Sequence, residues 1–443
     1  MMRRIIVLFL SVLLSIIILL FPAISASAEE PRLLSSSYEN RADAIYFYSY
    51  DAKSILYSKE TDKILKPAST VKIMTGLLAC EKLGSRLNEE ITITREMLVG
   101  HTGTTMGLTA GMNVSIEDLL YGAICGCNND AAQVLAFVCS GSVENFVSEM
   151  NSYAKRIGMT STVYANPTGL DDAMAQTSIS DVALLSHKAV KNELYIRISS
   201  AKNHTASLNG QPVVLYNRNA LISHFTSDKY LNDAVCGLNA GSTDEGGYVA
   251  SVLAESDGAK YLCIVMGADF DGEEIYSYKI VNELIAQADQ SFGKIMLFSQ
   301  GKQLSELDVN FALSTESEVK LSCVLEEDLY AYLPLNIDKN KDLKYRVFLH
   351  NETLDAPINK GAVVGGVTVY YKGEPIASGA LVAREEIEAN SFLVSMNSMK
   401  DFLISRYFLI FFAFLAIGIL IFLYFDRNYR RRKKVGYIHY KKF

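Results

Sequence analysis

Histidine is scarce in this chain of 443 residues, and its six histidines show no spacing typical of a metal site. No G-x-S-x-G segment occurs, which is the turn that presents the serine in one large class of hydrolases. The cysteines are odd in number and form no regular framework, which argues against a disulfide scaffold. We expect most of them to be buried as small hydrophobic residues. They lie at positions 80, 125, 127, 139, 236, 263 and 323.

Positive charge is also scarce over most of the chain. The net charge is −7, although Arg3, Arg4 and the segment RNYRRRKK at 427–434 add positive charge at the two ends. The region between the ends is therefore more acidic than the whole chain. Because an acidic surface repels phosphate groups, this composition argues against nucleic acid as a partner.

Each end carries a long apolar run. The run from Ile5 to Phe21 follows two arginines and precedes the small residues ASA at 26–28, which together predict a cleaved signal peptide at 1–28; an uncleaved anchor is the alternative. Residues 407–425 hold no charge, and at about 1.5 Å per residue they span about 28 Å, enough to cross a membrane. The basic residues that follow predict a cytoplasmic tail at 426–443 and an ectodomain outside.

Periodicity predicts the main elements between these ends. ADAIYFYSYDAKSILYSKETD at 42–62 alternates and turns like a β-hairpin, and residues 248–268 alternate as strands. Residues 68–83 have a helical apolar pattern that buries one side, and further helices are expected at 142–159 and in SISDVALLSHKAV. Ser115 begins a capping box that starts another helix. Helices between strands predict an α+β domain, one sheet flanked by helices, over 29–290.

Helical periodicity is lost in the last third of the ectodomain. The segments VKLSCVL, KYRVFL and VVGGVTVYYKGEPIASGALVA are typical of short strands joined by turns, which predicts a small all-β domain at 295–390. A linker is expected at 391–406, ahead of the transmembrane helix at 407–425.

The segment PASTVKIMT at 67–75 carries the most specific chemistry. Ser69 and Lys72 are three residues apart and would share one face of a helix. Serine becomes a nucleophile only when a base takes its proton, and lysine serves as that base when burial lowers its pKa. A helix beginning at Ser69 would also offer backbone N–H groups to an oxyanion. The alternative is the polar start of an ordinary helix, since S-x-x-K alone is common.

The flanking sequence resembles a known family. KILKPASTVKIMTGLLACEKL is similar to the nucleophile segment of the low-molecular-weight penicillin-binding proteins, the serine D-alanyl-D-alanine carboxypeptidases of the peptidase S11 type. TTMGLTAGMNVSIEDLLYGAICGCNNDAAQVLA, ANPTGLDD and GLNAGSTDEGGYVASV resemble further blocks in the same order. APINKGAVVGGVTVYYKGEPIASGALVA resembles the C-terminal β-domain, so the resemblance covers nearly the whole ectodomain.

The resemblance implies a complete first motif and an altered second one. Ser69 would be the nucleophile and Lys72 the base. In the second motif, S-x-N in the family, Cys127 stands at the serine and Asn129 at the asparagine. A thiol can relay a proton but forms weak hydrogen bonds, and a buried thiol without a role is the alternative for Cys127. Asn129 would bind the substrate amide, cap the following helix, or do both. His101 is expected to be a surface loop residue.

The third motif, K-T-G in the family, is altered as well. Asn239, Ala240 and Gly241 stand in its place, so a cation and a hydroxyl for the substrate carboxylate are missing. Gly241 keeps the glycine of the motif, at the position where the strand must approach its neighbours closely. Ser242 would still offer its backbone N–H as an oxyanion donor. Asn239 would make a weak contact with a substrate carboxylate or amide; the alternative is a solvated strand residue.

The resemblance implies a penicillin-binding-protein-like domain, a β-rich domain and one transmembrane helix in a bacterial cell membrane. The expected activity is removal of the terminal D-alanine from peptidoglycan stem peptides, with reduced turnover, no cofactor, and β-lactams as covalent inhibitors. A degenerate homologue that binds peptidoglycan or a partner in wall synthesis is the alternative. A class A β-lactamase is disfavoured, because the second motif is not S-D-N and the β-rich domain would be superfluous.

Overall fold

The computed structural model describes residues 33–100, 102–225, 228–314 and 318–439, and the chain divides into two compact units after Gly293. The predicted signal peptide at 1–28 and His101 lie outside the described residues. Each unit is described by itself below. The α+β architecture followed by an all-β domain, expected from the sequence, is confirmed.

The first unit is built on a five-stranded antiparallel sheet with the strand order β2-β1-β9-β8-β7. The predicted hairpin at 42–62 forms its first two strands, and the predicted strands after 248 form β8 and β9. Because strands from the two ends of the unit lie side by side, the chain between them returns over the sheet. The strands are β1 (Ala44–Ser49), β2 (Ser54–Lys59), β7 (Val235–Thr243), β8 (Gly247–Ser256) and β9 (Ala259–Ala268).

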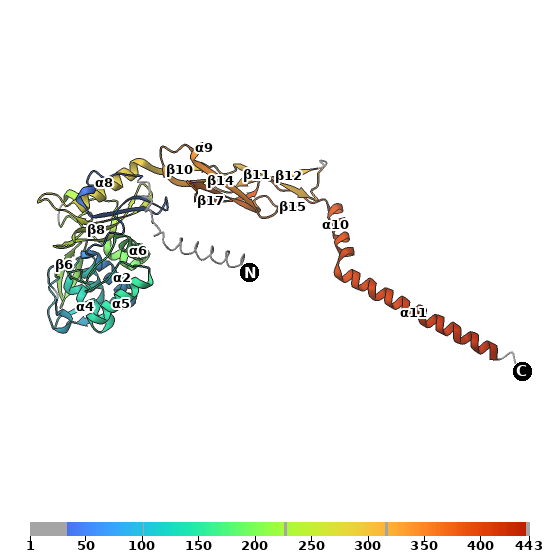
Figure 1. Ribbon diagram of the computed structural model, residues 1–443, viewed down its shortest axis with the longest axis horizontal. Helices are drawn as coiled ribbons and strands as arrows, with labels where there is room; N and C mark the ends of the chain where they lie inside the picture. Colours follow the sequence, from blue (N-terminus) through green and yellow to red (C-terminus); the bar gives the residue numbers. More distant parts are fainter. Residues whose placement is uncertain (1–32, 101, 226–227, 315–317, 440–443) are drawn as a thin grey trace, which may run out of the picture. The chain divides into compact units, whose positions relative to one another are not determined.

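Helices cover both faces of this sheet (Figure 1). On one face, the Ser251 hydroxyl of β8 is 2.9 Å from the Ser186 hydroxyl of α6. On the other face, the Tyr261 hydroxyl of β9 donates to Asp289 of α8 at 3.3 Å. The helices are α2 (Val71–Leu83), α3 (Ile116–Ile124), α4 (Asn129–Ser140), α5 (Val143–Arg156), α6 (Ile179–Ala189), α7 (Glu193–Ser199) and α8 (Tyr276–Ser291).

Helix α2 lies in the middle of the first unit. Its apolar residues Ile73, Met74, Leu77 and Leu78 are at most 2% exposed, as their spacing predicts. The prediction that only one side is buried was wrong, because the sheet and helices α3 to α7 surround the helix on nearly all sides. The start also differs: a 3₁₀ turn, η2 (Ala68–Thr70), precedes the α-helix. Such a turn tightens a helix end, and here it carries Ser69.

Serine side chains begin three of the surrounding helices. The Ser115 hydroxyl accepts from the Asp118 N–H at 3.0 Å, which confirms the capping pattern read from the sequence. Ser142 and Ser178 cap α5 and α6 in the same way, because a serine at this position satisfies an N–H that has no partner within the helix.

Two small antiparallel pairs lie outside the main sheet. They are β3 (Glu90–Thr92) with β4 (Asn113–Ser115) and β5 (Asn203–Leu208) with β6 (Gln211–Tyr216).

The second unit consists mainly of strands around its own core, in which Leu321, Val367 and Leu381 are fully buried. Six strands form one sheet with the order β14-β16-β17-β12-β11-β15, and β10 pairs with β13. A four-residue helix, α9 (Lys339–Asp342), interrupts the predicted run of strands. The strands are β10 (Phe292–Phe298), β11 (Gln303–Asn310), β12 (Val319–Leu325), β13 (Leu329–Pro334), β14 (Leu343–Leu349), β15 (Thr353–Asp355), β16 (Val363–Tyr371) and β17 (Glu374–Ala383).

The C-terminal segment is helical. The segment predicted as a linker, 391–406, consists mostly of the helix α10 (Ser391–Ile404), which has no buried residues; the Asn390 side chain caps this helix by accepting from two backbone N–H groups. Helix α11 (Arg406–His439) follows. Its part from Arg406 to Arg430 is long and apolar enough to cross a membrane. Helix α11 continues beyond the apolar part to His439, so the basic residues that follow Arg430 are helical as well.

Candidate active site

A pocket of about 380 Å³ in the first unit brings together segments that are far apart in the sequence. It lies where η2 and α2, the start of α4 and strand β7 meet. Seven of the eight residues singled out from the sequence line it, and Asn239 lies immediately beside it in contact with Cys127. The seven are Ser69, Lys72, Cys127, Asn129, Ala240, Gly241 and Ser242.

Ser69 lies in a tightly constrained part of the pocket and is 8% exposed. The preceding residue, Ala68, has a φ of +47°, a left-handed conformation that costs an alanine about 1–3 kcal/mol and is typical of functional sites. Strand β7 passes so close that a Cβ on Gly241 would lie 2.3 Å from the Ser69 hydroxyl oxygen. Glycine is therefore the residue that lets β7 approach the serine.

Lys72 lies one helical turn after Ser69 and is 4% exposed. Its ammonium nitrogen donates to the Thr168 carbonyl oxygen at 2.6 Å. Burial lowers the pKa of Lys72, and the neighbouring Cys127 opposes this effect only in part. Because burial disfavours the charged form, the side chain is shifted toward a free amine that can accept a proton.

The loop at 166–170 holds the carbonyl that faces Lys72. The Asn166 side-chain oxygen accepts from the Thr168 N–H at 3.1 Å, the Thr168 hydroxyl at 2.8 Å and the Gly169 N–H at 2.7 Å. Gly169 has a φ of +79°, and a Cβ there would lie 2.0 Å from the Ala68 carbonyl oxygen. The loop is thus rigid and packed directly against the turn that carries Ser69.

Cys127 and Asn239 form a neutral contact inside the site. The Asn239 amide donates to the Cys127 sulfur at 3.4 Å, and the thiol donates to the Ala240 carbonyl oxygen at 3.5 Å. Burial raises the pKa of the Cys127 thiol, while Lys72 and Arg218 act in the opposite direction. The structure therefore places Cys127 and Asn239, which are 112 positions apart in the sequence, in direct contact. All seven cysteines are free; three of them, including Cys127, are only partly buried.

Asn129 connects the start of α4 to the loop that precedes it. Its side-chain amide donates to the Thr102 carbonyl oxygen at 2.6 Å, and its backbone N–H donates to the Thr104 carbonyl oxygen at 2.7 Å. The next residue, Asp130, is fully buried and accepts from backbone N–H groups at 106–108 at about the usual length, 3.0–3.1 Å. This carboxylate, which sequence reasoning missed, fixes the loop at the pocket edge.

Two carboxamide oxygens of the site have no hydrogen-bond donor among the described residues. They belong to Asn129 and Asn239, which are 6% and 2% exposed. A buried oxygen without a donor costs free energy, so each is available to a donor supplied by a ligand or a water molecule. Asn129 also lines the pocket, so a ligand bound there could supply the donor.

Arg218 is a pocket residue that the sequence analysis did not find. Lys72 and Arg218 are the two basic residues among the described residues that line the pocket. The Arg218 backbone N–H donates to the Cys125 carbonyl oxygen at 3.1 Å, which ties the arginine to the second motif. The sequence NRN at 217–219 has no hydrophobic periodicity that would predict its place. Hydrogen bonds from this segment to the ends of α3 and α7 bring Arg218 to the pocket.

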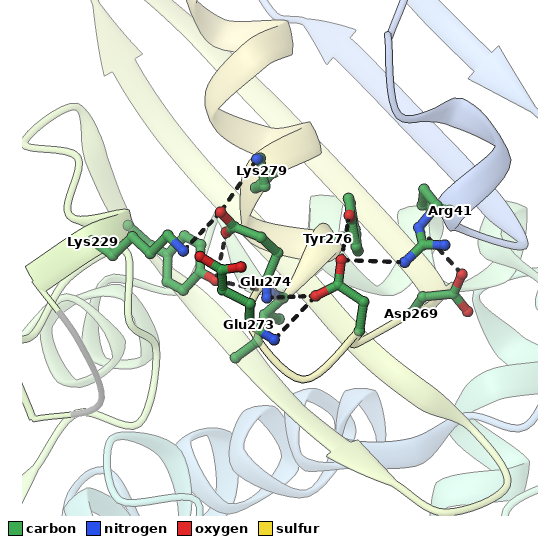
Figure 2. A network of polar contacts seen from close by, with 10 residues as sticks. Arg41, Lys229, Asp269, Glu273, Glu274, Tyr276 and Lys279 are labelled. Atoms are coloured by element: carbon green, nitrogen blue, oxygen red, sulfur yellow. Dashed lines mark hydrogen bonds and ion pairs between the residues drawn. The ribbon is translucent and has the colours of Figure 1, made fainter.

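Polar contacts support the wall formed by Ile275 and Tyr278. The Tyr230 hydroxyl accepts from the Ile275 N–H at 2.8 Å and donates to the Glu274 carboxylate at 3.1 Å. Figure 2 shows this carboxylate between Lys229 and Lys279, whose amino groups lie 2.7 and 3.5 Å away. These contacts join the start of α8 to the 3₁₀ turn η4 (Asp228–Tyr230), which follows the pocket residue Phe225.

Two known families together match most of the chain. Residues 28–270 match the peptidase S11 family, D-alanyl-D-alanine carboxypeptidase. Residues 292–389 match the C-terminal domain of penicillin-binding protein 5.

Individual relatives cover most of the chain. The D-alanyl-D-alanine carboxypeptidase DacA of Haemophilus influenzae is 30% identical over 381 residues, which are 84% of this chain and 91% of that protein. DacF of Bacillus subtilis is 26% identical over 398 residues, 88% of this chain and 96% of that protein. The crystal structure of penicillin-binding protein 5 from Haemophilus influenzae is 28% identical, covers 79% of this chain and 98% of its own, and has a TM-score of 0.55.

Proposed function

We propose, because this chain belongs to the peptidase S11 family of D-alanyl-D-alanine carboxypeptidases, that it removes the terminal D-alanine from peptidoglycan stem peptides through an acyl-enzyme on Ser69. The observation that carries the proposal is the pairing of Ser69 with a buried lysine of lowered pKa in one pocket. Lysine acts as a general base only as the free amine, and burial of Lys72 favours that form.

The reaction would proceed in two steps. The Ser69 hydroxyl oxygen attacks the carbonyl carbon of the penultimate D-alanine, and Lys72 accepts the hydroxyl proton. The peptide C–N bond then breaks, and the proton passes to the amine of the departing D-alanine. A water molecule, which gives up its proton to Lys72, attacks the ester and releases the shortened peptide and free Ser69.

The oxyanion of each step would be stabilised by two backbone N–H groups, those of Ser69 and Ser242. The close approach of β7 to the serine at Gly241 supports this role for the residue that follows. A backbone donor does not depend on the side chain, so the replacement of K-T-G by N-A-G leaves it unchanged. Removing one such donor typically costs about 2.7–4 kcal/mol, so its retention matters.

Turnover would be reduced because the third motif has lost a cation and a hydroxyl. Losing one member of a buried charge pair typically costs about 2–5 kcal/mol, which corresponds to roughly 30- to several-thousand-fold in rate. We propose that Arg218 compensates in part, because it is the second basic residue lining the pocket and would attract the substrate carboxylate. Asn239 and Ala240 would contribute little to that carboxylate.

A second candidate is a homologue that binds peptidoglycan without useful turnover. The contact between the Asn239 amide and the Cys127 sulfur favours it, since a neutral pair occupies the place where the family has a hydroxyl and a cation. Acylation by penicillin distinguishes the candidates, because the β-lactam carbonyl needs the nucleophile, base and oxyanion donors.

The decisive experiment is intact-mass analysis of the purified protein after incubation with penicillin. We expect a stoichiometric adduct on Ser69 that is absent from a Ser69→Ala variant. A folded protein without an adduct at high penicillin would favour the binding protein. An adduct combined with no release of D-alanine from a D-Ala-D-Ala peptide would identify a penicillin-binding protein that is not a peptidase.

We also propose that the chain is a single-pass bacterial membrane protein with its ectodomain outside. The apolar helix from Arg406 to Arg430 and the basic residues that follow support this orientation. Protease applied to intact cells should remove the ectodomain and spare a tag placed after Phe443. Loss of the tag with retention of the ectodomain would show the opposite topology.

A further inference from the structure

One face of the small hairpin β5–β6 is open to solvent. Strand register places Asn203 opposite Tyr216, Thr205 opposite Val214 and Ser207 opposite Pro212, and all six are exposed. We call these six residues the hairpin face. It consists of an amide and two hydroxyls on β5 beside three apolar side chains on β6, and none of its six residues carries a charge.

The hairpin face is continuous with the catalytic pocket through two aromatic rings. Tyr216, 43% exposed, stacks on Phe225, 52% exposed, with ring centroids 5.1 Å apart and planes inclined by 14°. Phe225 in turn lines the pocket, and the Arg218 guanidinium lies 5.2 Å from its ring centroid. A ligand that leaves the pocket past Phe225 therefore reaches Tyr216 and then the hairpin face.

We propose that the hairpin face binds the neutral N-acetylated sugar units of the glycan strand to which the stem peptide is attached. Tyr216 would stack against the C–H face of a sugar ring, since an aromatic ring offers a large flat apolar surface at small entropic cost. Asn203, Thr205 and Ser207 would exchange hydrogen bonds with sugar hydroxyl and N-acetyl groups. This inference rests on the proposed function for its choice of substrate.

The absence of charge selects the sugar over the peptide as the occupant. A peptidoglycan stem peptide carries free carboxylates, and a surface that binds it would be expected to offer cations. Arg218 lines the pocket and is not one of the six residues of the hairpin face. A neutral saccharide instead matches a row of hydroxyl, amide and aromatic groups.

The two aromatic rings give one substrate a path from the pocket to the hairpin face. A stem peptide held in the pocket and leaving past Phe225 would bring its sugar first to Tyr216, the member of the hairpin face that stacks on Phe225.

The test is direct binding of a neutral probe, the β-1,4-linked tetramer of N-acetylglucosamine, to the full chain in detergent micelles. Binding is measured by saturation-transfer NMR and calorimetry for the unchanged protein and for Tyr216→Ala, Tyr216→Phe and Val214→Glu. Losing an aromatic contact typically weakens binding about two- to thirteenfold, so we expect a loss in that range for Tyr216→Ala. Tyr216→Phe keeps the stack and should retain binding, and Val214→Glu should weaken it.

Penicillin acylation is measured on the same samples, and all three variants should be acylated like the unchanged protein. Tetramer binding that depends on Tyr216 in a protein that is never acylated would refute the proposed function and leave this inference standing. Failure of the tetramer to bind at millimolar concentration, or equal binding by Tyr216→Ala, would overturn the inference. So would a stem tetrapeptide whose binding, unlike that of the tetramer, depends on Tyr216.

Discussion

Gly241→Ala should separate the geometry of the nucleophile from the stability of the fold. Gly241 lies within β7 and is not among the glycines with positive φ, so alanine can adopt its backbone conformation. The added Cβ would nevertheless lie 2.3 Å from the Ser69 hydroxyl oxygen and 2.8 Å from the Ser69 Cβ. Ordinary van der Waals contact begins at 3.4 Å, so the serine and the strand must separate by 3.4 − 2.3, or roughly 1 Å.

That displacement sets the expected loss of activity. A misplacement of about 1 Å at a reacting group costs on the order of 100-fold in rate, equivalent to about 2.7 kcal/mol. Overpacking by one methyl group costs about 1–3 kcal/mol of folding free energy, which a domain of this size tolerates. We therefore expect a folded protein whose second-order rate of acylation by penicillin falls about 100-fold.

Intact-mass analysis of samples quenched at a series of times gives the acylation rate. Thermal unfolding followed by circular dichroism gives the stability. Ser242→Ala is the matched control: it changes the neighbouring exposed residue of the same strand and keeps the backbone N–H. Its rate should stay within about twofold of the unchanged protein, because the backbone N–H that Ser242 is proposed to supply is retained. A folded Gly241→Ala variant that is acylated at the normal rate would refute the placement of Ser69 against β7.

Three further outcomes follow from the same site. Asn239→Lys with Ala240→Thr should raise kcat/KM on a D-Ala-D-Ala peptide at least about tenfold, which is less than the roughly 30-fold of a ~2 kcal/mol gain because it allows for imperfect geometry; a folded variant with no gain would show a site reorganised around Asn239. The acylation rate should rise with pH through the lowered pKa of Lys72 and then level off, because the free amine is the base. A rate that falls over that range would exclude Lys72 as the base. Burial raises the pKa of Cys127, so iodoacetamide should label it slowly at pH 7 and faster as pH rises, and acylation of Ser69 should protect it; rapid labelling at pH 7 would show a thiolate.

Local pattern was enough to predict the elements whose neighbours in sequence decide their structure. The hairpin at 42–62 alternates with period two, and the helix after Ser115 begins with its own cap, so both formed as expected. The family blocks in their order also identified Ser69 and Lys72 as candidates. That the linker at 391–406 is helical was not predicted from the sequence; its helix α10 has no buried residues.

What the sequence by itself determined is the inventory of reactive groups, the order of the family segments and the apolar runs at both ends, since all of these depend on residue type and spacing. Tertiary structure alone decided the environment of those groups. The burial that lowers the pKa of Lys72 comes from loop 166–170 and from elements around α2, and Cys127 meets Asn239 only because α4 begins beside β7. Arg218 reaches the pocket from a segment without a pattern of its own. Contacts between residues a hundred positions apart depend on how the elements pack, which local spacing does not encode.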